Sequence, residues 1–401
     1  MGIVSRIAAH ETSTRGPVGH SRTLRVLTLT PFYPSIGDAS QGCFVAEPLT
    51  RTSGFNISNE VIAVQPFYRT RPRVLQSSVA SRWLSYFSLP GKPGLATAGR
   101  FLATGIRDAV LASHARKPFD MIHAHAVLPC GHAAAIFGQE LKIPFVVSVH
   151  GLDVFSTREA GPIFSNWRHR TSAAVYRRAQ AVICVSEKVR GQITCDMAAR
   201  TVVIYNGVDV QLFSPTAAPP PGLSVLSVGN LIPSKGHALL LRAFADISPG
   251  FPACRLEIIG EGSERRRLVH LARELGISER VTFHDRQSRE AVAQAMRACA
   301  IFALPSSYEG LGCVYLEAMA SGKPVIGCRG QGIDEVIEEG KNGLLISPGN
   351  QAELAEYMRV LLLNEAFRRR IGAAARERIL QRYTLEHQAG RLAQLYRECV
   401  Q

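Results

Sequence analysis

The sequence has no long hydrophobic run. None of its apolar stretches reaches the ~18 residues that a helix needs to span a bilayer, so no transmembrane segment is expected. The first 23 residues lack the apolar core of a signal peptide, and Arg6 stands where a myristoylation signal has Ser or Thr. We therefore expect a cytoplasmic protein, with peripheral contact at the cytoplasmic face of a membrane as an alternative that stays open.

The sequence also lacks the cysteine and histidine spacings of common metal sites. Its nine cysteines form no C-x-x-C pair, which favours reduced thiols over a disulfide framework. His123 and His125 form an H-x-H, with His132 and His150 downstream, but no carboxylate or cysteine completes a ligand set. Histidines at strand ends are the favoured interpretation, and no metal is predicted.

Negative charge is scarce in the first half of the chain. Residues 1–200 hold 23 Lys and Arg against 11 Asp and Glu, whereas residues 201–401 hold 23 against 21. Such an asymmetry indicates an anionic partner, which could be an acidic membrane surface, a phosphorylated acceptor or a nucleic acid. A generally basic proteome would give the same excess.

What is abundant is alternation between short β-rich runs and helical segments. A chain of 401 residues is too long for one ordinary core. Expected strands fall in two series, at 24–30, 59–64, 120–125, 144–151, 181–186 and 201–207, and then at 223–229, 255–262, 280–285, 299–306, 324–330 and 343–347. Expected helices between strands include 98–115 and 171–179. This pattern predicts parallel sheets covered on both faces.

The prolines of 213–222 separate the two series, as expected of an interdomain linker. We predict an α/β protein made of two Rossmann-like, doubly wound parallel-sheet domains that face a central cleft. The expected bounds are a flexible tail (1–22), an N-terminal domain (23–212), the linker (213–222), a C-terminal domain (223–383) and a terminal helix (384–401).

The stretch "SSYEGLGCVYLEAMASGKPVI" (306–326) carries two glutamates in an apolar setting. A helix is expected to open near Gly312, where its first N–H groups favour an anion. Cys313 and Glu317 are four residues apart and share one helix face. A nucleotide with its diphosphate at the helix start would bring its ribose to Glu317, while Glu309 at the cleft mouth could contact a sugar or positive charge at an anomeric carbon.

A second candidate anion site lies in "SVGNLIPSKG" (227–236). Gly229 follows a strand, and Lys235 stands directly before an apolar helix, where the helix dipole disfavours a cation that has no anion to face. A solvated lysine beside a capped helix is an equally good interpretation of Lys235 alone. His150 ends the strand 144–151 and could contact sugar or phosphate, or simply the backbone.

Taken together, "VGNLIPSKG", "ALPSSYEGLGCVYLEAMASGKPVI", "GQGIDEVIEEGKNGLLISPGN", "DMIHAHAVLPCGHAAA", "FVVSVHGLDVF" and "VIYNGVDVQLF" resemble the retaining, GT-B-fold glycosyltransferases of family 4. The resemblance covers about residues 24 to 400, and the E-x7-E of Glu309 and Glu317 is its most specific element.

The resemblance implies sugar transfer from a nucleotide diphosphate donor, such as a UDP- or GDP-sugar, to an acceptor hydroxyl, with no cofactor and no metal. It also implies that the N-terminal domain (23–212) binds the acceptor, that the C-terminal domain (223–383) binds the nucleotide sugar, and that the terminal helix (384–401) crosses back to the first domain. Glu317 would bind the ribose, and Glu309 and His150 would lie near the reacting sugar. Lys235 would neutralise the diphosphate, beside Gly229. The backbone from Gly310 through Leu311, Gly312 and Cys313 to Val314 would cap the phosphates.

Two departures from the family pattern affect the site. Asn230 stands where the family usually has arginine, so that Lys235, Arg329 or another basic residue would have to supply the charge. The loop 31–47 replaces a plain Gly-Gly turn, and Gly42 is the candidate for close backbone approach. Its G-x-F-V form resembles members that act on cell-surface polysaccharides and lipid-linked glycans. A small-molecule acceptor and a non-catalytic sugar-nucleotide-binding homologue are the alternatives.

The segment 65–94 interleaves basic and aromatic residues. Val79, Trp83, Tyr86 and Phe87 fall at helical spacing, which predicts either an aromatic helix at a membrane interface or an ordinary core helix or acceptor lid. Two other classes fit less well. A nicotinamide-dependent dehydrogenase would need G-x-G-x-x-G after 24–30, and nucleic-acid binding would rest on charge alone, so no nucleic-acid partner is predicted.

Overall fold

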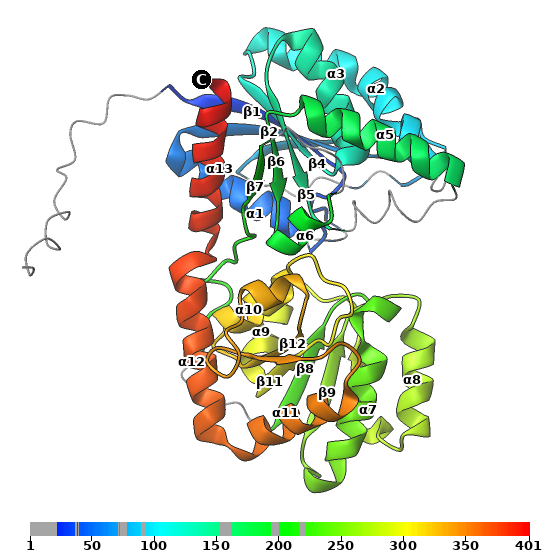
Figure 1. Cartoon of the computed structure of the whole chain (residues 1–401), viewed down its shortest axis with the longest axis vertical. Coiled ribbons are helices and arrows are strands. Elements are labelled where there is room, and N and C mark those ends of the chain that lie inside the picture. Colours follow the sequence, from blue (N-terminus) through cyan, green and yellow to red (C-terminus); the bar gives the residue numbers. More distant parts are fainter. Residues whose placement is uncertain are drawn as a thin grey trace, which may run out of the picture.

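The computed structural model describes residues 22–36, 38, 40–70, 72, 78–89, 94–151, 162–193, 200–216 and 222–401. The predicted flexible tail, apart from Arg22, lies outside these residues, and so do positions 217–221 of the predicted linker. Two α/β units are stacked along the long axis of the molecule (Figure 1).

The first unit contains, within the described residues, a seven-stranded parallel sheet in the order β3-β2-β1-β4-β5-β6-β7. Its strands are β1 (Leu24–Thr30), β2 (Ile57–Pro66), β3 (Ala80–Tyr86), β4 (Met121–His125), β5 (Phe145–Val149), β6 (Ala181–Cys184) and β7 (Thr201–Val203). The helices of this unit are α1 (Cys43–Arg51), α2 (Leu95–Arg116), α3 (His132–Leu141), α5 (Pro162–Arg178) and α6 (Glu187–Gly191).

The second unit contains a six-stranded parallel sheet in the order β10-β9-β8-β11-β12-β13. Its strands are β8 (Ser224–Val228), β9 (Arg255–Ile259), β10 (Val281–His284), β11 (Ile301–Ala303), β12 (Val325–Cys328) and β13 (Leu344–Ile346). The helices are α7 (His237–Ile247), α8 (Arg265–Glu274), α9 (Arg289–Ala298), α10 (Cys313–Ala320), α11 (Gln351–Leu363) and α12 (Glu365–Arg382). The predicted fold class is confirmed.

Both faces of each sheet are buried, as a parallel sheet requires. In the first sheet Leu27 and Leu29 share a buried cluster with residues of α2 and α3, while Val26 and Ile57 share another with the terminal helix α13 (Leu385–Val400). The same division holds in the second unit, where α7 and α11 cover one face and α9, α10 and α12 the other. This explains why the strands read as continuous apolar runs and not as alternating ones.

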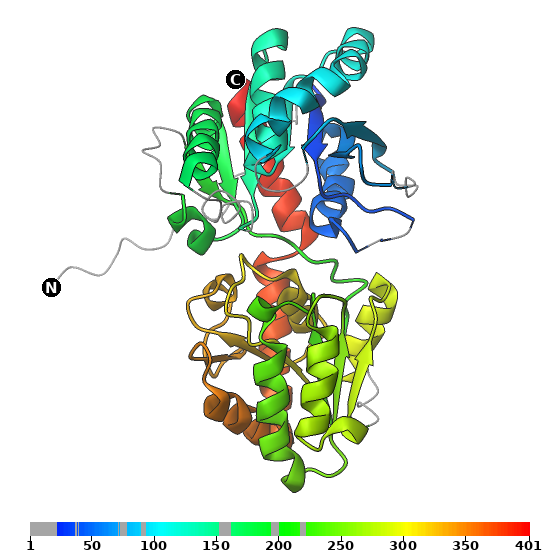
Figure 2. The same cartoon turned by 90° about the vertical axis from the view of Figure 1, so that its right-hand side faces the viewer.

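The helix α13 leaves the second unit and packs on the first (Figures 1 and 2). Thr384 caps it by accepting a hydrogen bond from the N–H of His387. Leu392, Leu395 and Tyr396 are buried against the first sheet, and such burial stabilises the attachment by about 1.5–3 kcal/mol for each side chain. The chain therefore crosses between the units twice, once near the prolines and once before α13.

The prediction of a helix around Val79, Trp83, Tyr86 and Phe87 is wrong. This segment forms the edge strand β3, which pairs in parallel with β2. Trp83 and Tyr86 are buried, whereas Phe87 is exposed. The tertiary environment of a sheet edge overrides the apparent helical spacing, because Trp and Tyr suit a pleated surface at least as well as a helix. A membrane-lying helix at this position is thus excluded, and no helix of the described residues is long and apolar enough to cross a bilayer.

Candidate functional site

A cleft of about 740 Å³ lies between the two units. This volume is in the range of small-molecule sites, and the cleft is bounded by carboxyl ends of strands in both sheets, where open α/β folds bind ligands. Most of the predicted site residues line it, namely Gly42, His150, Gly229, Asn230, Lys235, Glu309, Leu311, Gly312, Cys313, Val314 and Glu317. Gly310 is not among the lining residues.

The helix α10 begins at the wall of this cleft. Its N-cap, Gly312, has φ 86°, and a Cβ atom there would come within 2.5 Å of the Tyr315 ring, so the position requires glycine. The first N–H groups of a helix have no partner within the helix, and together with the helix dipole they favour an anion. Residues 313 and 314 therefore present a built-in anion-binding end to the cleft, as predicted for the start of this helix.

Lys235 and Glu309 form an ion pair across the cleft wall. Lys235 ends a short 3₁₀ turn (Pro233–Lys235) ahead of α7, and Glu309 lies in the loop between β11 and α10. Their side chains are only 18% and 13% exposed, so both charged groups are largely shielded from water. Each charge compensates the other, as a largely buried ion pair requires. Two sequence-predicted residues from separate strand exits are thus in direct contact.

Glu317 also has a partner, and it is one that the sequence did not predict. The Arg289 guanidinium pairs with Glu317 through Nη1 and with Glu47 of the first unit through Nη2, at 2.6 Å. Only 11% of the Arg289 side chain and 5% of the Glu317 side chain are exposed. Arg289 therefore joins the candidate ribose-binding carboxylate to the opposite side of the cleft.

A signal for Arg289 was present in the sequence. It is the first residue of α9, directly after the N-cap Ser288, and a cation is unfavourable in the first turn of a helix. The same anomaly had singled out Lys235. Glu47 gave no comparable signal. Burial raises the pKa of its carboxyl to about 7, and the neighbouring Arg289 limits that increase.

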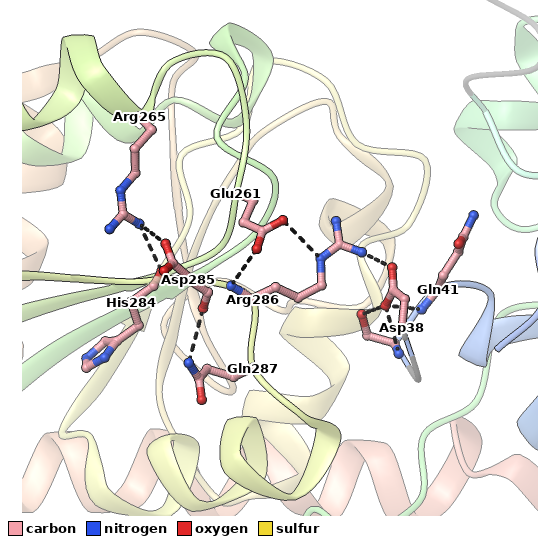
Figure 3. A network of polar contacts seen from close by, with 9 residues as sticks. Asp38, Gln41, Glu261, Arg265, His284, Asp285, Arg286 and Gln287 are labelled. Atoms are coloured by element: carbon pink, nitrogen blue, oxygen red, sulfur yellow. Dashed lines mark hydrogen bonds and ion pairs between the residues drawn. The ribbon is translucent and has the colours of Figure 1, made fainter. Parts of the chain in front are cut away.

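A third cation, Arg286, borders the cleft. Figure 3 shows Arg286 between Glu261 of its own unit and Asp38 of the first unit. The Arg286 Nε atom lies 3.7 Å from a Glu261 oxygen, and Asp38 also accepts a hydrogen bond of 3.0 Å from the N–H of Gln41. This network is more exposed than the one at Arg289, because 40% of the Arg286 side chain is accessible.

His150 faces the cleft at the end of β5, packed beside Phe44 with a ring-centroid distance of 4.8 Å. Its Nε2 atom lies 3.0 Å from Nδ1 of His125, and the two rings are stacked. Burial lowers the pKa of His150 to about 4 and that of His125 well below its ordinary value. Both imidazoles are therefore neutral near pH 7, and the N–H of one ring donates the hydrogen bond to the other, so His150 can act in hydrogen bonding and not as a cation.

The other histidine of the H-x-H is a structural residue. His123 Nδ1 lies 2.6 Å from the Tyr396 hydroxyl of α13, and its Nε2 lies 2.7 Å from the Ser148 hydroxyl. Burial lowers its pKa to about 3. No group of three or more His, Cys, Asp or Glu in the described part of the chain is placed to hold a metal ion.

Gly42 and Cys43 form the opposite wall, at the start of α1. Gly42 has φ 72°, and a Cβ atom there would lie 2.4 Å from the carbonyl carbon of Phe32. The close backbone approach predicted for Gly42 is therefore to its own chain. Burial raises the pKa of Cys43, and it raises that of Cys313 across the cleft to about 12, so both are neutral thiols near pH 7.

Two further predicted residues have clear positions. The Gly310 carbonyl accepts a hydrogen bond of 2.5 Å from the Ser186 hydroxyl and so belongs to the contact between the units. Arg329, suggested as a substitute for the missing arginine at Asn230, pairs instead with Glu339 and Glu353 and does not line the cleft. The cations that do line it are Lys235, Arg286 and Arg289.

The two units also contact each other through α6. The N–H groups of Glu187 and Lys188, in its first turn, each donate to the Glu335 carboxylate at 2.8 Å. The Lys188 ammonium donates to the Gly330 carbonyl at 2.6 Å. An acidic side chain from one unit thus caps a helix of the other, as the helix dipole favours.

The protein is thus built from two parallel α/β units with a cleft between their sheets, and the start of a helix faces that cleft. Two family models match successive parts of the chain: "Glycosyltransferase Family 4" over residues 60–212 and "Glycosyl transferases group 1" over residues 212–378. The chain belongs to this glycosyltransferase family, and its fold is GT-B.

Proteins of similar sequence are also glycosyltransferases. An uncharacterized glycosyltransferase of Methanocaldococcus jannaschii is 31% identical over 260 residues, covering 64% of this chain and 70% of that protein. The alpha-D-kanosaminyltransferase of Streptomyces kanamyceticus is 27% identical over 303 residues, covering 69% of this chain and 77% of the relative.

Solved structures show the same fold. Sucrose-phosphate synthase from Thermosynechococcus elongatus superposes with a TM-score of 0.76 at 23% identity, covering 93% of this chain and 98% of that one. Anabaena HepE, solved in complex with UDP and with UDP-glucose, superposes with a TM-score of 0.70 at 21% identity, covering 94% and 100%.

Proposed function

We propose that the protein is a retaining glycosyltransferase that moves a sugar from a nucleotide diphosphate donor to an acceptor hydroxyl. The observation that carries the proposal is that two largely buried charged pairs, Lys235 with Glu309 and Arg289 with Glu317, lie around the first turns of α10. The complexes of HepE with UDP and UDP-glucose support a nucleotide sugar as the ligand class.

The charged pairs suggest how the donor is held. When the diphosphate reaches the α10 N-terminus, the Lys235 ammonium exchanges its carboxylate partner for phosphate oxygens, and Glu309 is then free to face the sugar. Glu317 accepts hydrogen bonds from the ribose hydroxyls, while Arg289 holds the Glu317 carboxylate in a fixed orientation. The neutral His150 donates or accepts a hydrogen bond at the sugar, and closure of the cleft excludes water that would hydrolyse the donor.

For the acceptor, we propose a lipid-linked or cell-surface polysaccharide intermediate handled at the cytoplasmic side. The G-x-F-V form of the 42–45 segment and the positive charge of the first half support this choice. A small-molecule acceptor is the second candidate, because relatives include D-inositol 3-phosphate glycosyltransferases and sucrose-phosphate synthase. A non-catalytic sugar-nucleotide-binding homologue is less favoured, because both glutamates are present.

A donor screen tests the proposal. Thermal unfolding is followed with UDP-, GDP- and ADP-sugars, and the matching sugar nucleotide should raise the midpoint in a concentration-dependent way. Turnover of that donor with a glycan acceptor is then measured, and the anomeric configuration of the product is read by NMR. An inverted product contradicts the retaining mechanism, and no stabilisation by any of these sugar nucleotides contradicts the donor assignment.

A further inference from the structure

Four exposed aromatic side chains of the first unit gather on one surface, which we call the aromatic face. Its members are Phe67, Tyr68, Phe87 and Phe101, with exposed fractions of 56%, 46%, 48% and 40%. Single exposed apolar residues are ordinary, but a contiguous group of this size marks an interaction surface.

Ring contacts show that the aromatic face is continuous. Phe67 and Phe87 are stacked with centroids 5.5 Å apart and an interplanar angle of 9°, and Phe87 meets Phe101 edge-on at 5.0 Å. Tyr68 packs edge-on against Phe67 at 5.6 Å. The rings come from the ends of the adjacent strands β2 and β3 and from α2, and a backbone hydrogen bond of 2.8 Å from Phe67 to Tyr86 fixes the two strand ends together.

The stretch of sequence that supplies the aromatic face is positively charged, because residues 61–107 contain seven Lys and Arg and no Asp or Glu. Arg69 and Arg100 are exposed and directly flank Tyr68 and Phe101 in the chain. In contrast, Arg82 and Arg107 are paired with Glu60 and Glu140. Exposed rings with cations beside them match the interface of an anionic bilayer, where aromatic residues enter the headgroup region and cations meet the lipid phosphates.

We propose that the aromatic face docks the protein on an anionic lipid surface. Charge of one sign opposes a second copy of the same face, so self-association is disfavoured. One apolar anchor gives only marginal membrane binding, and a stable attachment requires a second signal, which the arginines supply.

Docking through the aromatic face would place the cleft near the lipid surface. Strands β1 and β2 run in parallel, so the end of β2 that carries Phe67 lies at the same sheet edge as the end of β1, after which Phe32 lines the cleft. Docking would therefore bring a membrane-embedded acceptor to the side of the cleft formed by the first unit. The docking itself does not depend on the proposed donor chemistry.

Vesicle flotation tests the proposal with the full chain. Vesicles of phosphatidylcholine alone are compared with vesicles that also contain phosphatidylglycerol, because an anionic surface attracts basic segments. The wild type should float with the anionic vesicles at low salt and much less at high salt. F67S/F87S should reduce the bound fraction by about tenfold, and R69E/R100E should abolish the salt-dependent part.

Leu363→Ser is the matched control, because Leu363 is an exposed apolar residue of the second unit, and it should bind like the wild type. Glu317→Ala should also float normally, which separates docking from donor binding. The proposal is overturned if the wild type does not float at low salt, or if F67S/F87S floats like the wild type. Retention on single-stranded DNA or heparin without flotation would identify a different polyanion and would equally overturn it.

Discussion

The two walls of the cleft present different kinds of polar groups. The wall from the second unit carries charged pairs built around Lys235 and Arg289, at the helix starts of α7 and α9. The wall from the first unit carries the neutral His150, flanked by Phe32 and Phe44, and its one described charged lining residue, Asp38, is already paired with Arg286. Cations and helix N-termini suit a diphosphate, whereas a neutral imidazole beside aromatic rings suits sugar hydroxyls and ring faces.

The difference also explains where the charge of the first unit lies. Among the described residues, the excess of Lys and Arg in residues 1–200 is not used on the cleft wall of that unit, because the described cations that line the cleft come from the second unit. The first unit instead has exposed arginines beside the aromatic face. We infer that one unit is specialised for the donor and the other for the acceptor and its surroundings.

The largest effect on turnover is expected when a carboxylate is removed from the charged wall of the second unit. Glu309→Gln and Glu317→Ala should each lower turnover by about 100-fold or more, the size expected for a preorganised group at the reacting centre or the donor. Steady-state transfer of the donor sugar measures the effect, and Glu339→Gln, which breaks an ion pair away from the cleft, is the control. Unchanged activity in either variant would remove that glutamate from the site.

Arg289 offers a sharper test, because it touches both walls. Arg289→Ala should raise the KM for the donor about tenfold, since Glu317 loses the partner that orients it, and Arg289→Lys should recover only part because it lacks the bidentate fork. Arg286→Ala, which removes the more exposed neighbour, should have a smaller effect. Equal KM values for the wild type and Arg289→Ala would show that Arg289 is only structural.

On the neutral wall, His125 can be changed without touching the cleft lining directly. His125→Phe keeps the ring stack on His150 but removes the hydrogen bond between the two rings, so kcat should fall several-fold with little change in the donor KM. The pH dependence of kcat is measured for both proteins. If the profiles and kcat of His125→Phe match those of the wild type, the histidine pair does not position His150.

The smallest expected effect concerns Glu47 and pH. Its carboxyl pKa is raised to about 7, so the folded protein retains a proton that the unfolded chain has released, and stability falls as pH rises from about 4.5 to 7. The contribution is at most about 3 kcal/mol. Glu47→Gln should therefore lose less stability than the wild type between pH 5 and pH 8 in thermal unfolding. Parallel stability profiles for the two proteins would contradict this assignment.

Much of the fold could be predicted because parallel strands buried on both faces give unbroken apolar runs. The prediction for residues 79–87 was wrong because an edge strand has only one neighbouring strand and mixes apolar with polar residues. Apolar spacing over so few residues fits a helix equally well. In the site, Glu317 and Lys235 could be found from the local sequence. Glu317 is a carboxylate in an apolar helix, and Lys235 is a cation directly before the start of a helix. Glu47 and Asp38 could not, because their partners lie more than 200 residues away in the other unit.

The central claim is that Glu317 meets the ribose of a donor whose diphosphate lies at Lys235. Titration calorimetry tests it with the nucleoside diphosphate that the donor screen selects and with its 2′,3′-dideoxy analogue. The wild type should bind the analogue at least about tenfold more weakly, and Glu317→Ala should bind the two compounds equally well. Equal affinity of the wild type for both compounds, or an undiminished preference in Glu317→Ala, would contradict the account.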